Sequence, residues 1–228
     1  MAFLPAKGIK PVEAGLFYLG LVASAFLIYL AAQGRAAEIG LWEALGVVTG
    51  VYSVWYQARE NIWLFPVGLS NSLVYMLIFW KGRLLGNFSL QVFYAVTEVA
   101  GWWWWIFRGH SRGTYRTSWM PWQQWPLWLL VGGGITAGLV PLFRSWQDPS
   151  PLLDAGTMAF SFVAQYQLAR KYTDNWLTWV VVDAVSVGLF WSQHLYATAM
   201  LSVFYLALCP PGIRTWIANS KIPDQAIA

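Results

Sequence analysis

The chain has 228 residues, of which 58% are hydrophobic and 11% charged, whereas about 25% of the residues in an ordinary soluble domain are charged. So few charges cannot cover a water-facing surface, which excludes an ordinary soluble protein. The formal net charge of +4 does not indicate nucleic-acid binding, because the basic residues lie in short segments between apolar stretches. The composition therefore predicts an all-α integral membrane protein.

Eight apolar stretches reach or approach the roughly 17 to 25 residues that a helix needs to cross a bilayer. The first follows two lysines, as in a secretory signal, but its apolar run exceeds the usual signal core of roughly 7 to 15 residues, so we expect a retained helix. The last is short and ends at Pro210-Pro211, which break or kink a helix, or it extends beyond them to Trp216. The stretches are 11–32, 39–57, 61–80, 85–107, 122–143, 152–171, 175–192 and 195–209.

The basic residues predict the orientation of these eight helices. If the amino terminus is cytoplasmic, ten of the 14 Lys and Arg residues fall on the cytoplasmic side. The other four, Arg35, Lys81, Arg83 and Arg144, fall outside. Cytoplasmic loops carry the excess of positive charge in membrane proteins, so both termini are expected in the cytoplasm.

An internal repeat relates residues 43–105 to residues 154–216 at an offset of 111 positions. The offset superimposes Val92-Phe93-Tyr94 on Val203-Phe204-Tyr205 and Phe79-Trp80 on Phe190-Trp191. Slips of one residue would also pair Tyr56-Gln57 with Tyr166-Gln167, and Asn71 with Asp183.

Each repeat contains three helices and one helix lies between the repeats, so the repeats are predicted to be parallel. Parallel repeats form the SWEET-like transporter architecture, with substrate held between them near the middle of the bilayer. The predicted segments are an amino-terminal segment with an extra helix (1–38), a first repeat (39–108), a basic loop with the linker helix (109–151), a second repeat (152–217) and a tail (218–228).

Asp183 lies at the centre of its predicted helix, where a lipid-facing carboxylate would cost about 3 kcal/mol, so it should face the protein interior. Trp179, Ser186 and Phe190 share its helical face. An aromatic ring beside a carboxylate suits a flat cationic ring. The alternative is a protonated Asp183 that bonds to a neighbouring helix.

A second group of candidate binding residues lies in the first repeat. Asn71, with Tyr75 one turn later, would lie at the same depth in the membrane as Asp183 and could contact the same substrate. The alternative is that Asn71 forms a hydrogen bond to a neighbouring helix and has no role in binding. Gln91, Tyr94 and Glu98 form a polar and aromatic stripe at helical spacing that continues to Trp102. Glu98 could contact substrate, relay a proton or neutralise a helix contact.

Other conspicuous features have structural interpretations. The run Gly101-Trp-Trp-Trp-Trp105 precedes a basic loop, where an aromatic belt is expected, and Arg170-Lys171 is expected to fix topology. Glu43 and Asp154 lie near helix amino termini, where carboxylates are favoured. The single cysteine, Cys209, is expected to be a small buried residue. Motifs for phosphate binding, metal hydrolysis or a serine nucleophile are absent, so we expect neither an enzyme nor a cofactor.

The chain resembles the PnuC family through Asn71, Leu90-Gln91-Val-Phe, Gly101-Trp102 with Trp105, and Arg170-Lys171-Tyr-x-x-Asn175-Trp176-x-x-Trp179. The resemblance covers about residues 42 to 216. It implies a SWEET-like fold in a bacterial inner membrane and facilitated diffusion of nicotinamide riboside, which a cytoplasmic kinase then traps.

Glu98 and Asp183 stand where some nicotinamide riboside transporters carry asparagine, so the resemblance leaves the vitamin open. Thiamine also contains a cationic ring, whereas neutral riboflavin suits two acidic residues less well. The expected partners are therefore a small vitamin and the lipid bilayer, with no nucleic acid, and a homo-oligomer is compatible with the sequence. A membrane scaffold without transport activity is the alternative of another class.

Overall fold

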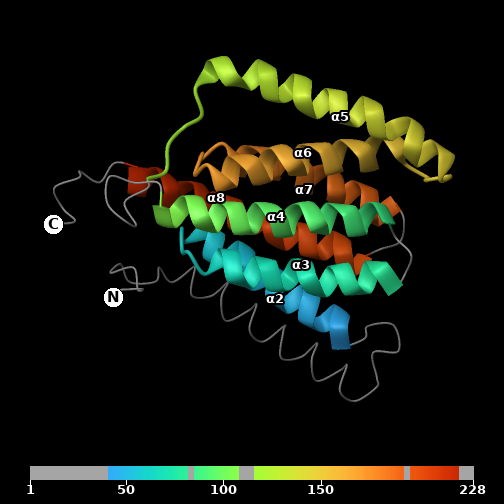
Figure 1. The fold of residues 1–228 in the computed structure, drawn as a ribbon, viewed down its shortest axis with the longest axis horizontal. Helices are drawn as coiled ribbons and strands as arrows, with labels where there is room; N and C mark the ends of the chain where they lie inside the picture. Colours follow the sequence, from blue (N-terminus) through green and yellow to red (C-terminus); the bar gives the residue numbers. More distant parts are fainter. Residues whose placement is uncertain (1–40, 82–84, 108–115, 193–195, 221–228) are drawn as a thin grey trace. The chain divides into compact units, whose positions relative to one another are not determined.

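The computed structural model describes residues 41–81, 85–107, 116–192 and 196–220, and within them the chain is helical (Figure 1). The predicted helix at 11–32 and residues 221–228 of the predicted tail lie outside these ranges, whereas residues 218–220 of that tail belong to the last helix. The α-helices are α2 (Leu41–Ala58), α3 (Leu64–Lys81), α4 (Leu85–Phe107), α5 (Trp125–Ser145), α6 (Pro151–Ala169), α7 (Asn175–Ser192) and α8 (Tyr196–Ser220). A short 3₁₀ helix, η1 (Trp122–Gln124), precedes α5.

The seven described helices agree closely with the stretches predicted from hydropathy. The predicted bounds of α4 and α7 are those observed, and most other ends differ by three residues or fewer. The main difference is α8, which continues through Pro210 and Pro211 to Ser220. Near the prolines, the Cys209 thiol and the Thr215 hydroxyl donate to the carbonyls of Tyr205 and Pro211. Side-chain bonds of this kind help a membrane helix to accommodate proline.

The chain divides into two compact units, residues 1–98 and 99–228. In the first unit α2 packs against α3, and in the second α6 packs against both α5 and α7, while α7 also packs against α8. Within the described residues, three segments are long and apolar enough by themselves to cross a bilayer: Leu64–Lys81, Trp122–Ser145 and Ala199–Ser220.

Many large apolar side chains are exposed on these helices. Leu130 is 74% exposed and Val181 62%. In water, exposed apolar area on this scale would favour aggregation, whereas lipid tails solvate it. The exposed side chains therefore agree with the composition in indicating a multi-pass membrane protein.

The helices α2 and α6 end in the same turn. Glu60 and Lys171, which are 111 positions apart, both have a left-handed backbone, with φ of 52° and 54°. The amides of Glu60 and Asn61 donate to the carbonyls of Gln57 and Tyr56. The amides of Lys171 and Tyr172 donate to those of Leu168 and Gln167. This is the Schellman pattern of helix termination.

The turns and the helix ends recur at an offset of 111 positions, without the one-residue slips that the sequence comparison suggested. In the turns, Tyr56 corresponds to Gln167 in its hydrogen bonding, and not to Tyr166. The helices α3 and α7 each have 18 residues, with both ends 111 positions apart. At this offset Ser72 aligns with Asp183, and Asn71 aligns with Val182.

Candidate functional site

The most distinctive polar groups of the second unit lie along one face of α7. Asp183 and Ser186 are each 8% exposed, and Trp179 precedes Asp183 by one turn. Among the described residues, neither the Asp183 carboxylate nor the Ser186 hydroxyl has a hydrogen-bond partner, and the buried Trp179 indole nitrogen has none either. Buried polar groups are normally paired, so three unpaired groups on one face indicate a place for a ligand or water.

This face offers a specific set of chemical groups. The carboxylate can accept hydrogen bonds or balance a positive charge, the hydroxyl can donate or accept, and the indole can donate through its nitrogen. The Trp179 ring also provides a flat surface for stacking. Phe190, half-buried on the same helix, is two turns beyond Asp183. Together these groups can bind a planar, polar molecule with positive charge.

A segment that precedes α5 holds the beginning of α7 in place. The Asp174 carboxylate accepts hydrogen bonds from the Met120 amide at 2.6 Å and from the Trp125 indole nitrogen at 3.1 Å. The Ser118 amide donates to the Lys171 carbonyl, and the Thr173 amide donates to the Ser118 carbonyl. We refer to residues 117–125 as the strap. Its hydrogen bonds attach the strap to the turn between α6 and α7.

A second set of contacts joins α7 to α6 and α8. The Thr178 hydroxyl donates to the Gln167 side chain at 2.7 Å, between α7 and α6. Trp176 packs edge-on against Trp216 of α8. A methyl group at Gly212 would lie only 2.5 Å from the Trp176 ring, so the close packing of α7 and α8 requires glycine at that position. These contacts support the helix that carries Asp183.

Two sequence-based interpretations concern this region. Lys171, which is predicted to fix topology, is buried, and its amino group lies 4.2 Å from the centre of the Trp105 ring. Trp105 was expected in an aromatic belt, but it is only 4% exposed and contacts Trp216. Trp103, 63% exposed, fits the belt. A run of identical residues around a helix places some inside and some outside.

In the first unit, Asn71 and Tyr75 of α3 both contact α2 at Gly46. The Asn71 amide group donates to the Gly46 carbonyl at 2.6 Å and to the Thr49 hydroxyl at 3.0 Å. A methyl group at Gly46 would lie 2.9 Å from the Tyr75 ring. The amide nitrogen of Asn71 is therefore used in a contact between helices.

The predicted stripe on α4 separates into buried and exposed parts. Gln91 and Glu98 are 9% and 7% exposed, Tyr94 is half-buried, and Trp102 is 37% exposed. The side-chain amide oxygen of Gln91 is buried and has no hydrogen-bond partner among the described residues. The Glu98 carboxylate lies against Gly68 of α3, where an added methyl group would come within 2.7 Å of it. Gln91 and Glu98 are thus interior groups, whereas Trp102 turns outward.

The sequence did not single out Thr117, Ser118 or Asp174. Asp174 immediately precedes α7, which is where a helix-capping residue is expected, and this position was the only available signal. Its actual partners are more than 45 residues away along the chain. Within the described residues, no cluster of His, Cys, Asp and Glu could hold a metal ion.

Comparisons with known proteins found similar sequences and one similar solved structure. The nicotinamide riboside transporter PnuC of Escherichia coli is 24% identical over 221 residues, covering 86% of this chain and 92% of the relative. The riboflavin/roseoflavin transporter RibM of Streptomyces davaonensis is 26% identical over 193 residues, covering 82% and 90%. A crystal structure of the vitamin B3 transporter PnuC has a TM-score of 0.74 at 19% identity, covering 94% of each chain.

The family model described as nicotinamide mononucleotide transporter matches residues 40–218. This range includes all the described helices except the last two residues of α8. The chain therefore belongs to the nicotinamide mononucleotide transporter family of membrane transport proteins.

Proposed function

We propose that this protein carries nicotinamide riboside across the bacterial inner membrane. The observation that supports the proposal best is the face of α7 with Trp179, Asp183 and Ser186, whose buried polar groups have no partner in the described protein. The nicotinamide ring is flat and positively charged in the riboside, so it can stack on the indole while the carboxylate balances its charge. The ribose hydroxyls can bond to the carboxylate and to the Ser186 hydroxyl.

The same face favours the riboside over the mononucleotide and over riboflavin, but it does not separate the riboside from thiamine. The mononucleotide adds a phosphate, which would be repelled by Asp183, and α7 carries no basic residue to receive it. Riboflavin has no positive ring charge, so Asp183 gives it no electrostatic advantage. Thiamine has a cationic ring and remains the closest competitor. The E. coli relative, described as a nicotinamide riboside transporter, and the RibM relative, described as a riboflavin transporter, are about equally similar in sequence.

We further propose a core of two parallel three-helix repeats with substrate between them, preceded by an extra helix and separated by α5. The matching ends of α3 and α7 and the matching turns before them support this arrangement. The helix α5 also ends in a turn of this type, at Gln147, so the turn alone is not specific. The stronger support is that the two turns and the two helices are all separated by the same number of residues, 111. Eight membrane crossings with both termini cytoplasmic complete the proposed topology.

We propose facilitated diffusion through alternating access as the transport mode, because the sequence contains no phosphate-binding loop to couple transport to ATP. In proteoliposomes, the protein alone should equilibrate nicotinamide riboside across the membrane without concentrating it. Sustained accumulation driven by an imposed proton or sodium gradient would contradict this mode and would implicate Glu98 in coupling.

Calorimetric titration of the purified protein tests the substrate directly. Nicotinamide riboside should bind most tightly, followed by thiamine, with riboflavin and the mononucleotide weaker. Tighter binding of riboflavin than of the riboside would contradict the proposed role of the carboxylate. Absence of heat and of any tryptophan fluorescence change with all four compounds would favour the scaffold function instead.

A further inference from the structure

Few residues of helix α5 are buried within the described part of the chain. Gly132 and Phe143 are its buried residues, and it packs against α6. Leu130 is 74% exposed and Leu127 57%. Since the segment Trp122–Ser145 is apolar enough to cross a bilayer, the uncovered face of α5 is exposed to lipid.

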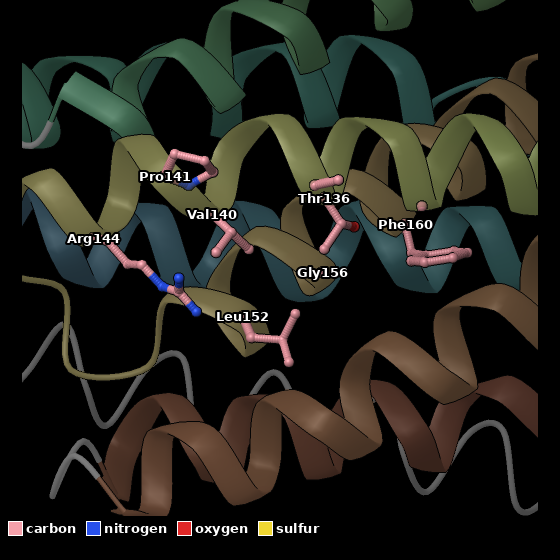
Figure 2. A pocket seen from close by; sticks show the side chains of 9 residues that line it. Thr136, Val140, Pro141, Arg144, Leu152, Gly156 and Phe160 are labelled. Carbon is pink, nitrogen blue, oxygen red and sulfur yellow. The ribbon is translucent and has the colours of Figure 1, made fainter.

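A groove of about 620 Å³ lies between α5 and α6 (Figure 2). Small residues create this space: Gly133 of α5 has no atom within 4 Å of the place where a side chain would begin, and Gly156 of α6 has only a methyl group of Thr136 at 4.0 Å. The neighbouring Gly132 instead packs against the ring of Phe160, which lines the groove. The groove is therefore open, apolar and formed by side chains of two helices.

Arg144 lies at the opposite end of the groove from Phe160 (Figure 2). It is the second-to-last residue of α5, and Trp146, half-exposed and stacked on Phe143, follows it. Tryptophan and arginine at the end of a membrane helix are typical of the level of the lipid headgroups. The groove thus runs from the headgroup level toward the hydrocarbon layer.

The Arg144 guanidinium is exposed and makes no hydrogen bond or ion pair with any residue that the structure describes. The nearby Asp148 carboxylate instead accepts a hydrogen bond from the Ser150 amide. An unpaired guanidinium at the headgroup level is complementary to a phosphate, which it can bind through two parallel hydrogen bonds. An apolar groove that begins beside this cation is complementary to an acyl chain.

We propose that this groove binds one phospholipid of the surrounding bilayer, with an acyl chain between α5 and α6 and the phosphate on Arg144. The lipid would fill the space at Gly133 and Gly156 and complete the packing of an otherwise uncovered helix. Basic pockets between membrane helices are known to hold phospholipid headgroups. The site is independent of the face of α7 that carries Asp183.

Native mass spectrometry of the detergent-purified protein, titrated with phosphatidylglycerol, tests this inference. Arg144→Gln removes the phosphate contact and Gly133→Leu fills the groove. The matched controls are Arg214→Gln, an exposed and unpaired arginine in α8 outside the groove, and Gly138→Leu, an open glycine of α5 that does not line it. Thermal unfolding of each variant verifies that it is folded.

We expect one tightly retained lipid per chain. Arg144→Gln should weaken its binding about tenfold, since the charge-assisted contact with the phosphate is lost, and Gly133→Leu should abolish it. Both controls should bind as the parent does. Diacylglycerol, which lacks the phosphate, should bind weakly and should not distinguish Arg144→Gln from the parent.

Equal losses in Arg144→Gln and Arg214→Gln would mean non-specific lipid association and would overturn the proposal. Unchanged retention in Gly133→Leu would also overturn it, because the lipid would then lie elsewhere. If Gly133→Leu instead converted an oligomer into monomers without a change in retained lipid, the groove would be an interface between copies of the chain.

Discussion

The turn between α2 and α3 and the turn between α6 and α7 have the same backbone but different surroundings. Asp174, in the second turn, accepts two hydrogen bonds from the strap. Its counterpart 111 positions earlier is Trp63, which is 51% exposed. The left-handed residue is the buried Lys171 in one turn and the half-exposed Glu60 in the other. A shared backbone geometry therefore does not require shared side-chain contacts.

The helices after these turns differ in the same way. In α7 the interior carries Asp183 without a partner, whereas its counterpart in α3 is the buried Ser72. In the first unit the carboxylate comes from α4 instead, as Glu98, and lies against Gly68. The comparison teaches that one backbone plan can place its interior carboxylate on different helices, on α7 in the second unit and on α4 in the first.

The largest expected difference between the turns concerns stability. Asp174→Ala leaves the Met120 amide and the Trp125 indole nitrogen without their partner, at a cost of about 2 to 5 kcal/mol in the free energy of unfolding. Trp63→Ala, at the exposed counterpart, should change it by less than about 1 kcal/mol. Thermal unfolding in detergent measures both variants. Equal losses would show that the strap contributes nothing special to the second turn.

The two close glycine contacts provide the next comparison. Gly212→Ala brings a methyl group to 2.5 Å from the Trp176 ring, and Gly68→Ala brings one to 2.7 Å from the Glu98 carboxylate. The indole is held by Trp216, whereas a carboxylate can turn aside. We expect a loss of about 1 to 3 kcal/mol for Gly212→Ala and a smaller loss for Gly68→Ala, measured by thermal unfolding. A larger loss for Gly68→Ala would identify Glu98 as the more rigid group.

Substrate binding should depend on α7 more than on α4. Trp179→Ala removes a stacking surface worth about 0.5 to 2 kcal/mol, so affinity for nicotinamide riboside should fall roughly 2- to 30-fold. Asp183→Asn keeps the shape of the side chain and removes its charge. It should therefore weaken the binding of the cationic riboside. The binding of the reduced riboside, whose nicotinamide ring is neutral, should be nearly unaffected.

Calorimetry with both ligands separates a substrate contact from a structural role. Glu98→Gln, the matched change in the first unit, should lower affinity less than Asp183→Asn does. If Asp183→Asn weakened both ligands equally, the assignment of Asp183 to the substrate site would be wrong.

The smallest expected effect concerns the left-handed residues. Glu60→Gly relieves a backbone cost of about 1 kcal/mol and should raise the free energy of unfolding by several tenths of that amount. Lys171→Gly relieves the same cost but removes the amino group that lies over Trp105. It should give no gain. Thermal unfolding that showed equal gains would mean that the contact between Lys171 and Trp105 contributes no stability.

Hydropathy predicted the described helices well because their apolar stretches are separated by short turns. The ends of α4 and α7 were predicted correctly, since Gly82-Arg83 and Thr173-Asp174 interrupt the apolar pattern beside them. The end of α8 was left open because the sequence does not show how the freed carbonyls near Pro210 and Pro211 are satisfied. The helix at 11–32 lies outside the described residues and stays a prediction.

For the candidate site, helical periodicity placed Asp183, Ser186 and Glu98 inside correctly, because a charged or polar group at mid-helix is costly in lipid. It could not show that the Asn71 amide is used on Gly46, or that Lys171 is covered by Trp105, since both contacts depend on how separate helices pack. Direct contact of any of these residues with substrate stays a prediction.

The two consecutive prolines of α8 have a mechanical consequence. Because neither has an amide hydrogen, the carbonyls of Leu206 and Ala207 receive no hydrogen bond from the next turn of the helix. Bending α8 at this level therefore breaks fewer backbone hydrogen bonds than bending α4. In α4 the positions of the two prolines are taken by Val99 and Ala100, which both have amide hydrogens. If the transporter opens alternately to the two sides, we expect α8 to flex there while α4 moves as a stiff rod.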